Sequence, residues 1–476
     1  MTQLPITIAG TSTQTMPPTS DGLPDRPEVS DPTSFDVPSP TVFELANGAQ
    51  VWYVRRSELP LVSIRLVVAG GSSSDPQQHP GLAWLTDTML FHGSGQRDAA
   101  QFAADTERLA IEMDISTSVV ASVLYVDTHT DRLNDALSLL ADAVLRPTLP
   151  QDELTRVREL QNGDILLGGS RPQTIASWVA AREYFGKDHP GRLPSIGTPW
   201  GIKDVTTADL EASWSNRFSP NRATFVVVGD VDEATLREAL TSHFGLWSTH
   251  SAIEDLPIPE GIDDGPKCLV VEHPGATQTT IRVLFPGWAY SQDLQSAGRL
   301  ATIAIGGTFT SRLNRLMREE KGYTYGASAH SSSGIDHGIV VASTSVNSAS
   351  TKEALSDLVS IISQPEPFTD NELQKARQSH RTQTIESISS RASLATSLAR
   401  LAIQELPPDH INLDLIEMGP VATDQLDDAW KHVSGLTNAL FIIVGDLGSV
   451  QEPAQAIFGT RCHLIDKRFL PTIAAS

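Results

Sequence analysis

The order of apolar and polar residues along the chain predicts alternating strands and helices. Apolar runs such as SVLYVDTHT and GIVVASTSV are typical of buried strands. They are followed by DRLNDALSLLADAVL and STKEALSDLVSII, in which apolar residues recur three and four positions apart, as in helices with one buried face. Asn47-Gly48 lies between apolar residues and predicts a hairpin at the start of the folded sequence.

Three pairs of similar segments recur in the same order at nearly one offset, between 216 and 219 residues. The pairs are SIRLVVAGG from Ser63 with TIRVLFPGW from Thr280, LPQDELTRVRELQ from Leu149 with FTDNELQKARQSH from Phe368, and ATFVVVGDV from Ala223 with ALFIIVGDL from Ala439. A single pair would carry little weight, because many strands share such strings. Three collinear pairs predict an internal duplication.

The duplication predicts two homologous lobes, residues 39–249 and 267–476. Residues 250–266, rich in Pro, Gly and Asp, read as the linker, and residues 1–38, rich in Pro, Ser, Thr and Asp, read as a flexible leader. The mixture of hairpins, strands and long helices predicts an α+β fold. In each lobe we expect a mixed, largely antiparallel sheet with helices mainly on one face.

Composition and motifs exclude several classes of function. The chain has 35 Lys and Arg against 57 Asp and Glu, a net charge of −22, which argues against nucleic acid and anionic membranes as partners. An acidic surface or a cationic substrate would fit this balance. There is no dinucleotide-binding G-x-G-x-x-G, P-loop, G-x-S-x-G, C-x-x-C or H-E-x-x-H motif. Cys268 and Cys462 are far apart in sequence and predict neither a metal motif nor a disulfide framework.

Two segments resemble the insulinase/pitrilysin-like zinc metallopeptidases (peptidase family M16). The first, PGLAWLTDTMLFHGSG from Pro80, is similar to the active-site helix G-x-A-H-x-x-E-H-M-L-F-x-G-[ST] of that family. The second, GGTFTSRLNRLMREEKGYTYGASA from Gly306, is similar to its other recurrent segment. The resemblance covers roughly residues 40–465 and implies two related lobes that enclose a chamber.

The zinc-binding frame is lost in this sequence. The resemblance assigns the two histidine positions to Trp84 and Thr88, the general-base glutamate to Asp87, and the third ligand to Asp164. Tryptophan offers no lone pair to a metal and threonine is a poor neutral ligand, so we expect no metal in this chain. Trp84 is expected to fill the vacated site with apolar bulk. The nearby His79 and His92 flank the helix and do not restore two histidines on one face.

The second segment keeps the residues that the family uses on the substrate. There, an arginine near the helix end and a tyrosine seven residues later bind the peptide backbone and stabilise the oxyanion; the matching residues are Arg318 and Tyr325. Without the resemblance, Arg318 would be read as the partner of Glu319 or Glu320, and Tyr325 as a strand residue with its ring in the core.

The resemblance therefore implies the non-catalytic subunit of a heterodimeric zinc peptidase. Such a chain has no peptidase activity alone, and the zinc belongs to a homologous partner with an intact H-x-x-E-H motif. Unfolded peptides are the expected substrates, held by strand addition to a sheet edge near residues 113–118. The alternative is a peptidase-derived structural or peptide-binding protein without a catalytic role. The leader favours the periplasm slightly over the cytoplasm, although no signal peptide is present as written.

Overall fold

The structure is a computed structural model, and it describes Phe35 and residues 37–186, 189–248, 267–334, 337–363, 365–435 and 438–465. The chain divides between Asp36 and Val37, and all the described residues except Phe35 belong to the unit that begins at Val37. Nearly all of the predicted leader and all of the predicted linker lie outside the described residues. Val37, at the end of the predicted leader, is buried, and its backbone exchanges two hydrogen bonds with the side chain of Asn412.

The described residues of the first half form one large mixed sheet. Its strands are β1 (Thr41–Glu44), β2 (Gln50–Arg55), β3 (Leu61–Ala69), β6 (Glu112–Thr117), β7 (Ala121–His129) and β8 (Ala223–Gly229). They lie in the order β1-β2-β8-β3-β7-β6, and neighbours are antiparallel except β2 and β8. The predicted hairpin at Asn47-Gly48 joins β1 to β2, and Gly48 has a φ of 92°, which glycine adopts without strain.

Helices of the first half, apart from α5 (Pro172–Phe185), pack against one face of this sheet and around its edges. They are α1 (Leu82–Met89), α2 (Ala99–Leu109), α3 (Leu133–Leu145), α4 (Gln151–Gly168), α6 (Pro199–Ile202), α7 (Thr207–Arg217) and α8 (Glu233–Phe244). A short hairpin of β4 (Gly93–Ser94) and β5 (Arg97–Asp98) lies between α1 and α2. Leu137 of α3 and Leu240 of α8 belong to the same core as Val227 of β8, as their apolar spacing predicts.

The second half repeats this arrangement. Its strands are β9 (Lys267–Glu272), β10 (Gln278–Pro286), β11 (Thr324–Ser333), β12 (Gly338–Asn347), β13 (Leu440–Gly445) and β14 (Cys462–Ile465). Its helices are α9 (Gln295–Thr302), α10 (Arg312–Asn314), α11 (Thr351–Ser363), α12 (Asp370–Ile388), α13 (Arg391–Ile403), α14 (His410–Met418), α15 (Thr423–Val433) and α16 (Leu447–Phe458). Two π-helical segments, Ile303–Gly307 and Arg315–Glu320, follow α9 and α10.

The strand order bears out the predicted duplication. The second sheet runs β11-β12-β10-β13-β9-β14, and its first five strands correspond one by one to β6-β7-β3-β8-β2. The sequence pairs fall on β3 with β10, α4 with α12, and β8 with β13. Only the outermost strand differs, because β1 is antiparallel to β2 whereas β14 is parallel to β9.

The last strand also brings the two cysteines together. Cys462 of β14 lies in register with Cys268 of β9, although 193 residues separate them in the sequence. Cys268 is fully buried and Cys462 is partly exposed. Their separation along the chain therefore gave no indication of this contact.

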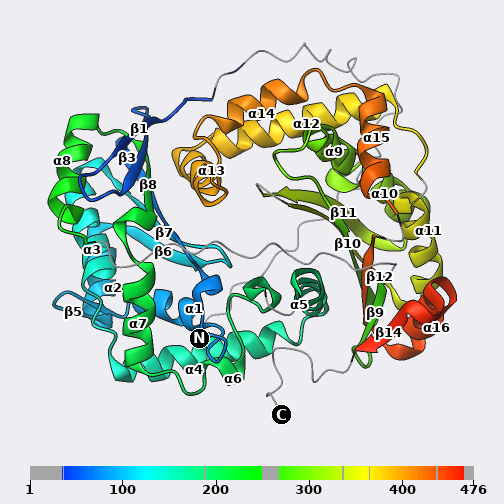
Figure 1. Ribbon diagram of the computed structural model, residues 1–476, viewed down its shortest axis with the longest axis horizontal. Coiled ribbons are helices and arrows are strands. Elements are labelled where there is room, and N and C mark those ends of the chain that lie inside the picture. Colours follow the sequence, from blue (N-terminus) through cyan, green and yellow to red (C-terminus); the bar gives the residue numbers. More distant parts are fainter. Residues whose placement is uncertain are drawn as a thin grey trace, which may run out of the picture. The chain divides into compact units, whose positions relative to one another are not determined.

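Each half also contributes one helix to the opposite sheet (Figure 1). Helix α5 packs its buried side chains, among them Val179, on β9, β10, β12 and β13 of the second half. Helix α13 packs on β3 and β8 of the first half, where Arg65 donates a hydrogen bond to Thr396 at 3.2 Å. The sequence predicted helices mainly on one face of each sheet. The exchanged helices cover part of the other face, because β13 is apolar on both sides (LFIIV).

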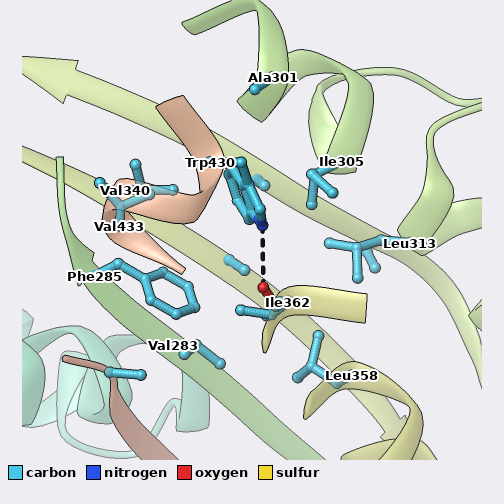
Figure 2. Close-up of a cluster of buried hydrophobic side chains, with 14 of the residues drawn as sticks. Val283, Phe285, Ala301, Ile305, Leu313, Val340, Leu358, Ile362, Trp430 and Val433 are labelled. Atoms are coloured by element: carbon cyan, nitrogen blue, oxygen red, sulfur yellow. Dashed lines mark hydrogen bonds between the residues drawn. The ribbon is translucent and has the colours of Figure 1, made fainter. Parts of the chain in front are cut away.

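The core of the second half is centred on an aromatic residue of α15 (Figure 2). Trp430 is 1% exposed and packs among apolar residues that include Phe285 of β10 and Leu313 of α10. Its indole N–H donates to the Ile362 carbonyl at 3.0 Å, so the one polar atom of the ring is satisfied at the end of α11. None of the helices in the described ranges is both long enough and apolar enough to cross a membrane.

Candidate functional site

The helix that matches the zinc-binding segment is anchored at its first turn. Helix α1 begins after Gly81, whose φ of 99° favours glycine. Both carboxylate oxygens of Asp75 accept hydrogen bonds at 2.7 Å, one from the Gly81 N–H and one from the Ala83 N–H. Burial nevertheless raises the pKa of Asp75 to about 7. The start of α1 is therefore fixed by the partly buried carboxyl group of Asp75, eight residues before Ala83.

Asp87, at the position of the general base, forms a buried ion pair. Its side chain is 0% exposed, and its Oδ1 lies 2.6 Å from Arg217 Nη2 at the end of α7. Its Oδ2 accepts hydrogen bonds from the hydroxyls of Thr117 (2.6 Å) and Ser122. The Arg217 guanidinium also donates to Ser122 Oγ and to the Ala83 carbonyl. The carboxylate thus ties α1 to α7, β6 and β7, and it has no exposed oxygen that could activate a water molecule.

The other three positions of the zinc frame do not converge on a metal site. Trp84 is half-buried and packs against the apolar cluster formed by α1, α4 and α7. Thr88 donates its hydroxyl hydrogen bond to the Trp84 carbonyl at 2.9 Å, within the same helix. Asp164 is exposed on α4. Within the described ranges, no group of three or more His, Cys, Asp or Glu side chains is placed to hold a metal ion. The residues present do not fit a zinc ion.

The two flanking histidines have other partners. His79 Nδ1 lies 3.0 Å from the Gly201 carbonyl, and His92 Nδ1 lies 3.0 Å from Arg156 and 3.4 Å from Glu153. Each ring is therefore held by residues outside α1. Among the described residues, the two histidines do not form a common metal site.

Arg318 and Tyr325, the second predicted pair, have accessible side chains. The Arg318 guanidinium lies 3.7 Å from the centre of the Phe309 ring and is 31% exposed. Its nearest carboxylate, Glu319, is 3.7 Å away and itself 56% exposed, which is a weak pair. Tyr325 is 93% exposed, so its ring does not lie in the core. No contact joins Arg318 to Tyr325 among the described residues.

The local backbone explains why Tyr325 faces outward. The pairing of β11 with β12 shifts register between Thr324 and Ala327, which is a β-bulge on the edge strand. Thr324 Oγ1 lies 2.8 Å from the carbonyl oxygens of both Gly326 and Ser345, so its one hydroxyl proton is shared between them and closes the bulge. A bulge turns a side chain away from the regular alternation of a strand, and Tyr325 is the residue turned here.

Two residues of the same segment, not singled out from the sequence, hold this bulge and the Arg318 segment in place. Asn314 accepts a hydrogen bond from the Ala327 N–H at 2.8 Å and donates to the Thr308 carbonyl at 2.9 Å. Arg312 pairs with both oxygens of Glu372 at 2.6 and 2.8 Å. Arg318 follows in π-helical backbone, a conformation common at functional sites. In the sequence, Arg312 and Asn314 could have been singled out only as polar residues next to apolar ones in SRLNRLM.

Tyr325 lines a small cavity of about 270 Å³ between α5 and the second sheet. Gln173 of α5 forms one side and donates a hydrogen bond to Ser345 of β12 at 3.2 Å. Arg282 of β10 forms another side, and it also lines a much larger cavity. Arg282 was not among the predicted site residues, although a lone charge in the strand TIRVLF was visible in the sequence.

The larger cavity, of about 2330 Å³, lies between the two halves. The first half contributes residues of β2, β3 and α5, and the second half contributes β10, β11, β12 and the end of α13. Trp84, Asp87, Thr88 and Arg318 are not among the described residues that line it. The cavity is the chamber that the sequence resemblance implied, but the degenerate zinc positions do not open into it.

Comparisons with known proteins agree with these features. The model of the insulinase family (peptidase family M16) matches residues 51–165, and the model of the peptidase M16 inactive domain matches residues 204–379. An uncharacterized zinc protease of Bacillus subtilis, YmxG, is 20% identical over 62% of this chain and 70% of its own length. A Helicobacter pylori protein described as a non-peptidase homolog is 23% identical over 58% of this chain and 63% of its own. The alignments therefore leave about a third of each relative unmatched.

Among solved structures, a peptidase M16 inactive domain from Pseudomonas fluorescens is similar to this fold. It has a TM-score of 0.78 and 22% identity, and the match covers 86% of this chain and 98% of that one. At this identity the likeness speaks for the fold alone. The two family models together span more than half of the sequence, and their matches reach into both halves. The chain therefore belongs to peptidase family M16, and its residues 204–379 match the inactive-domain model of that family.

Proposed function

We propose that this chain is the non-catalytic subunit of a two-subunit M16 peptidase. In this proposal a homologous partner with an intact H-x-x-E-H motif holds the zinc. This chain helps to enclose an unfolded peptide and presents Arg318 and Tyr325 to the peptide backbone. A fixed cation and a hydroxyl donor are the groups needed where negative charge develops on a peptide carbonyl.

The observation that carries the proposal is the contrast between the two half-sites. Asp87 is sealed in an ion pair with Arg217, and Trp84 and Thr88 cannot serve as metal ligands. Tyr325 is 93% exposed, with no hydrogen-bond partner for its hydroxyl among the described residues, and Arg318 has only a weak pair with Glu319. An exposed aromatic ring does not contribute the stabilisation that it would give in the core. A strand residue with a purely structural role would be expected to keep its ring buried.

The edge strands offer a way to hold an extended peptide. Strand β6 (Glu112–Thr117) is the last strand of the first sheet and contains most of the segment predicted for strand addition. Its outer edge has backbone N–H and C=O groups that an extended peptide can pair with. We place the substrate backbone along this edge as part of the proposal.

The second candidate is a peptide-binding protein without a role in catalysis. It is favoured by the size of the cavity between the halves, about 2330 Å³, which a peptide segment fits without any catalytic group. The two candidates differ in whether Arg318 and Tyr325 affect the rate of cleavage or only the affinity for peptide.

The test is to mix the purified chain with a homologous M16 subunit that has the complete zinc helix. Cleavage of a fluorogenic peptide should appear or rise on mixing, while this chain alone is inactive and binds no stoichiometric zinc. Arg318→Ala and Tyr325→Phe should each lower kcat of the mixture by roughly a hundredfold, the effect of removing one oxyanion donor.

The matched control is Arg315→Ala, because Arg315 lies in the same π-helical segment, is 64% exposed and pairs only weakly with Glu320. It should leave the rate unchanged. If both site variants leave kcat unchanged but weaken peptide binding, the second candidate is the function. Robust cleavage by this chain alone would overturn the proposal.

The cellular compartment is a separate part of the proposal. A leader rich in Ser, Thr and Pro suits an exported spacer, so we place the complex in the periplasm. Fractionation of cells that produce the full-length protein, with a cytoplasmic marker as the control, tests this placement.

A further inference from the structure

Arg282 is a charged residue in the middle of a strand that is otherwise mostly apolar. In β10, Ile281 and Val283 point into the core of the second half, so Arg282 between them lies on the opposite face. That face divides into two parts. Over β13 and β9 it is apolar and covered by α5, through residues such as Leu269 and Ile442. Over β12 and β11 it lines the two cavities and carries polar residues such as Ser343 and Ser345, although Val341 of β12 belongs to the apolar part.

The Arg282 side chain is without an acceptor among the described residues. Its Nε is buried, and no hydrogen bond or ion pair to it is made by the described residues. Burial lowers the pKa of Arg282 from its usual value, because no carboxylate offsets the loss of water. Other deeply placed arginines differ in this respect: Arg217 is paired with Asp87 and Arg312 with Glu372. A partly buried guanidinium without a counter-charge destabilises the fold unless a bound anion compensates its charge.

A second unsatisfied polar group lies directly beside it. Ser343 of β12 is the cross-strand neighbour of Arg282, and its hydroxyl is also buried without a partner in the described chain. The next cross-strand pair, Thr280 and Ser345, shares a hydrogen bond at 3.1 Å. Two adjacent orphaned groups, one a fork of N–H donors and the other a hydroxyl, form a cradle for an anionic oxygen pair.

The charge around this cradle is opposite in sign to that of the whole chain. The protein has a net charge of −22, yet the described residues that line the larger cavity include arginines 192, 222 and 282 against two carboxylates, Asp75 and Glu405. Arg217 also lines the cavity, but its charge is paired with Asp87. Asp75 is occupied in holding the start of α1. The acidic residues therefore lie mainly elsewhere, and the cavity wall near Arg282 attracts anions.

We infer that Arg282 and the Ser343 hydroxyl bind a carboxylate of a peptide held between the two halves. The inference rests on the proposed function, in which this cavity takes peptides, and it gives the substrate class: peptides with an acidic side chain or a free C-terminus. The Arg282 guanidinium donates two N–H bonds to the carboxylate oxygens and the Ser343 hydroxyl donates a third. Because the sequence alone allowed a preference for cationic substrates, this reverses the expectation from net charge.

The experiment measures the affinity of the full-length chain for fluorescent, unstructured peptides that differ only in charge. One peptide is neutral with an amidated C-terminus, and a second carries two central glutamates in an otherwise identical sequence. A third is neutral with a free C-terminal carboxylate, and a fourth carries two central lysines. We expect the second or third peptide to bind roughly tenfold to a hundredfold tighter than the neutral one, as for hydrogen bonds to a charged group. Which of the two gains affinity distinguishes a side-chain carboxylate from a C-terminal one.

Three variants connect this preference to the site. Arg282→Met should abolish it and leave the neutral peptide unaffected, and Arg282→Lys should keep only part of it, since lysine lacks the fork. Ser343→Asp should also abolish it by pairing Arg282 internally, and it should raise the melting temperature, so a loss of binding cannot be ascribed to unfolding. Arg132→Gln is the matched control, because Arg132 is 48% exposed and pairs with Asp131 and Asp135 on the surface.

The outcomes separate this inference from the proposed function. If all four peptides bind equally, or if the lysine peptide binds best, the carboxylate site is wrong and the peptide-binding role stands. If an acidic preference exists but survives Arg282→Met and Ser343→Asp, the assignment to Arg282 is wrong. If no peptide binds to the chain or to its complex with a zinc-containing subunit, the proposed function fails and this inference fails with it.

Discussion

Asp87 shows how a single side chain changes its role when its neighbours change. A carboxylate at this position is compatible with general-base chemistry by type, but here it is fully buried and shared among Arg217, Thr117 and Ser122. The position of Asp87 and the absence of the histidines could be predicted from the sequence. The pairing with Arg217 could not, because the ion pair joins residues 130 positions apart. Such long-range pairs follow from the packing of α1 against α7 and cannot be read from local spacing.

We therefore expect Asp87→Ala to affect stability. Removing one partner of a buried ion pair leaves the other charge uncompensated, so the free energy of unfolding should fall by about 3 to 5 kcal/mol. Urea unfolding followed by tryptophan fluorescence measures this change. The double variant Asp87→Leu/Arg217→Met should recover much of the loss, because both charges are gone. Asp164→Ala, at an exposed position on α4, is the control and should change stability little. A stable Asp87→Ala protein would contradict the structural role.

The two cysteines give a second prediction at this scale. Cys268 is fully buried, and Cys462 is partly exposed. The hydrogen bond from Cys268 lowers the pKa of Cys462, whereas the same contact and burial raise the pKa of Cys268. Iodoacetamide should therefore modify Cys462 in the native protein and leave Cys268 unmodified, because the thiolate is the nucleophile. Peptide mapping by mass spectrometry checks this, with a sample in denaturant, where both should react. Equal labelling of the native protein would contradict the buried contact.

At the scale of elements, the amphipathic helices and the Asn-Gly hairpin followed from the sequence. The π-helical backbone around Arg318 did not, because the same apolar spacing fits an ordinary helix to within one residue. The bulge at Tyr325 could not be predicted either, since it depends on the hydrogen bond that Asn314 accepts from Ala327 and on the one that Thr324 donates to Ser345. Tyr325 was placed by resemblance alone, and its exposure could be known only from the structure.

Helix α12 offers a prediction with a pH dependence. Burial would raise the pKa of Glu372, but hydrogen bonds from Arg312 and from Thr369 outweigh it and lower the pKa to about 2, against 4.5 for the free side chain. The stabilisation is therefore complete above pH 4.5 and is lost as the pH falls from 4.5 towards 2. Glu372→Gln should lower the free energy of unfolding at pH 6 by on the order of 3 kcal/mol, as the pKa difference implies.

The pH profile of this variant is the decisive measurement. The difference between the wild-type protein and Glu372→Gln should shrink as the pH is lowered from 5 to 3. Glu386→Gln, at an exposed position on the same helix, is the matched control and should follow the wild-type curve. A constant difference across this range would show that Glu372 stabilises α12 by packing rather than by its charge.

At the scale of the whole molecule, the duplication was readable from three sequence pairs, but the exchange of helices was not. Helices α5 and α13 occupy equivalent places in the two repeats, and each packs on the sheet of the other half. Their apolar faces predict a partner sheet without saying which one, because both sheets have apolar strands. The cavity that contains Arg282 and Tyr325 depends on this exchange, since α5 forms one wall of it.

The exchange predicts that the halves fold as one unit. Produced alone, residues 267–476 would lack α5 and would expose Leu269, Leu284, Ile442 and neighbouring residues, an apolar face that promotes aggregation. Residues 37–249 would lack α13 over β3 and β8. Each fragment should therefore aggregate or bind a hydrophobic dye, and co-expression of the two should yield a soluble complex. Size-exclusion chromatography checks this outcome. Val179→Asp in α5 of the intact chain should lower the melting temperature of both halves together, whereas Thr155→Asp, at an exposed position of α4, should not. If residues 267–476 alone give a soluble monomer with one cooperative unfolding transition, α5 is dispensable to the second sheet, and the shared wall of the cavity is not what joins the two halves.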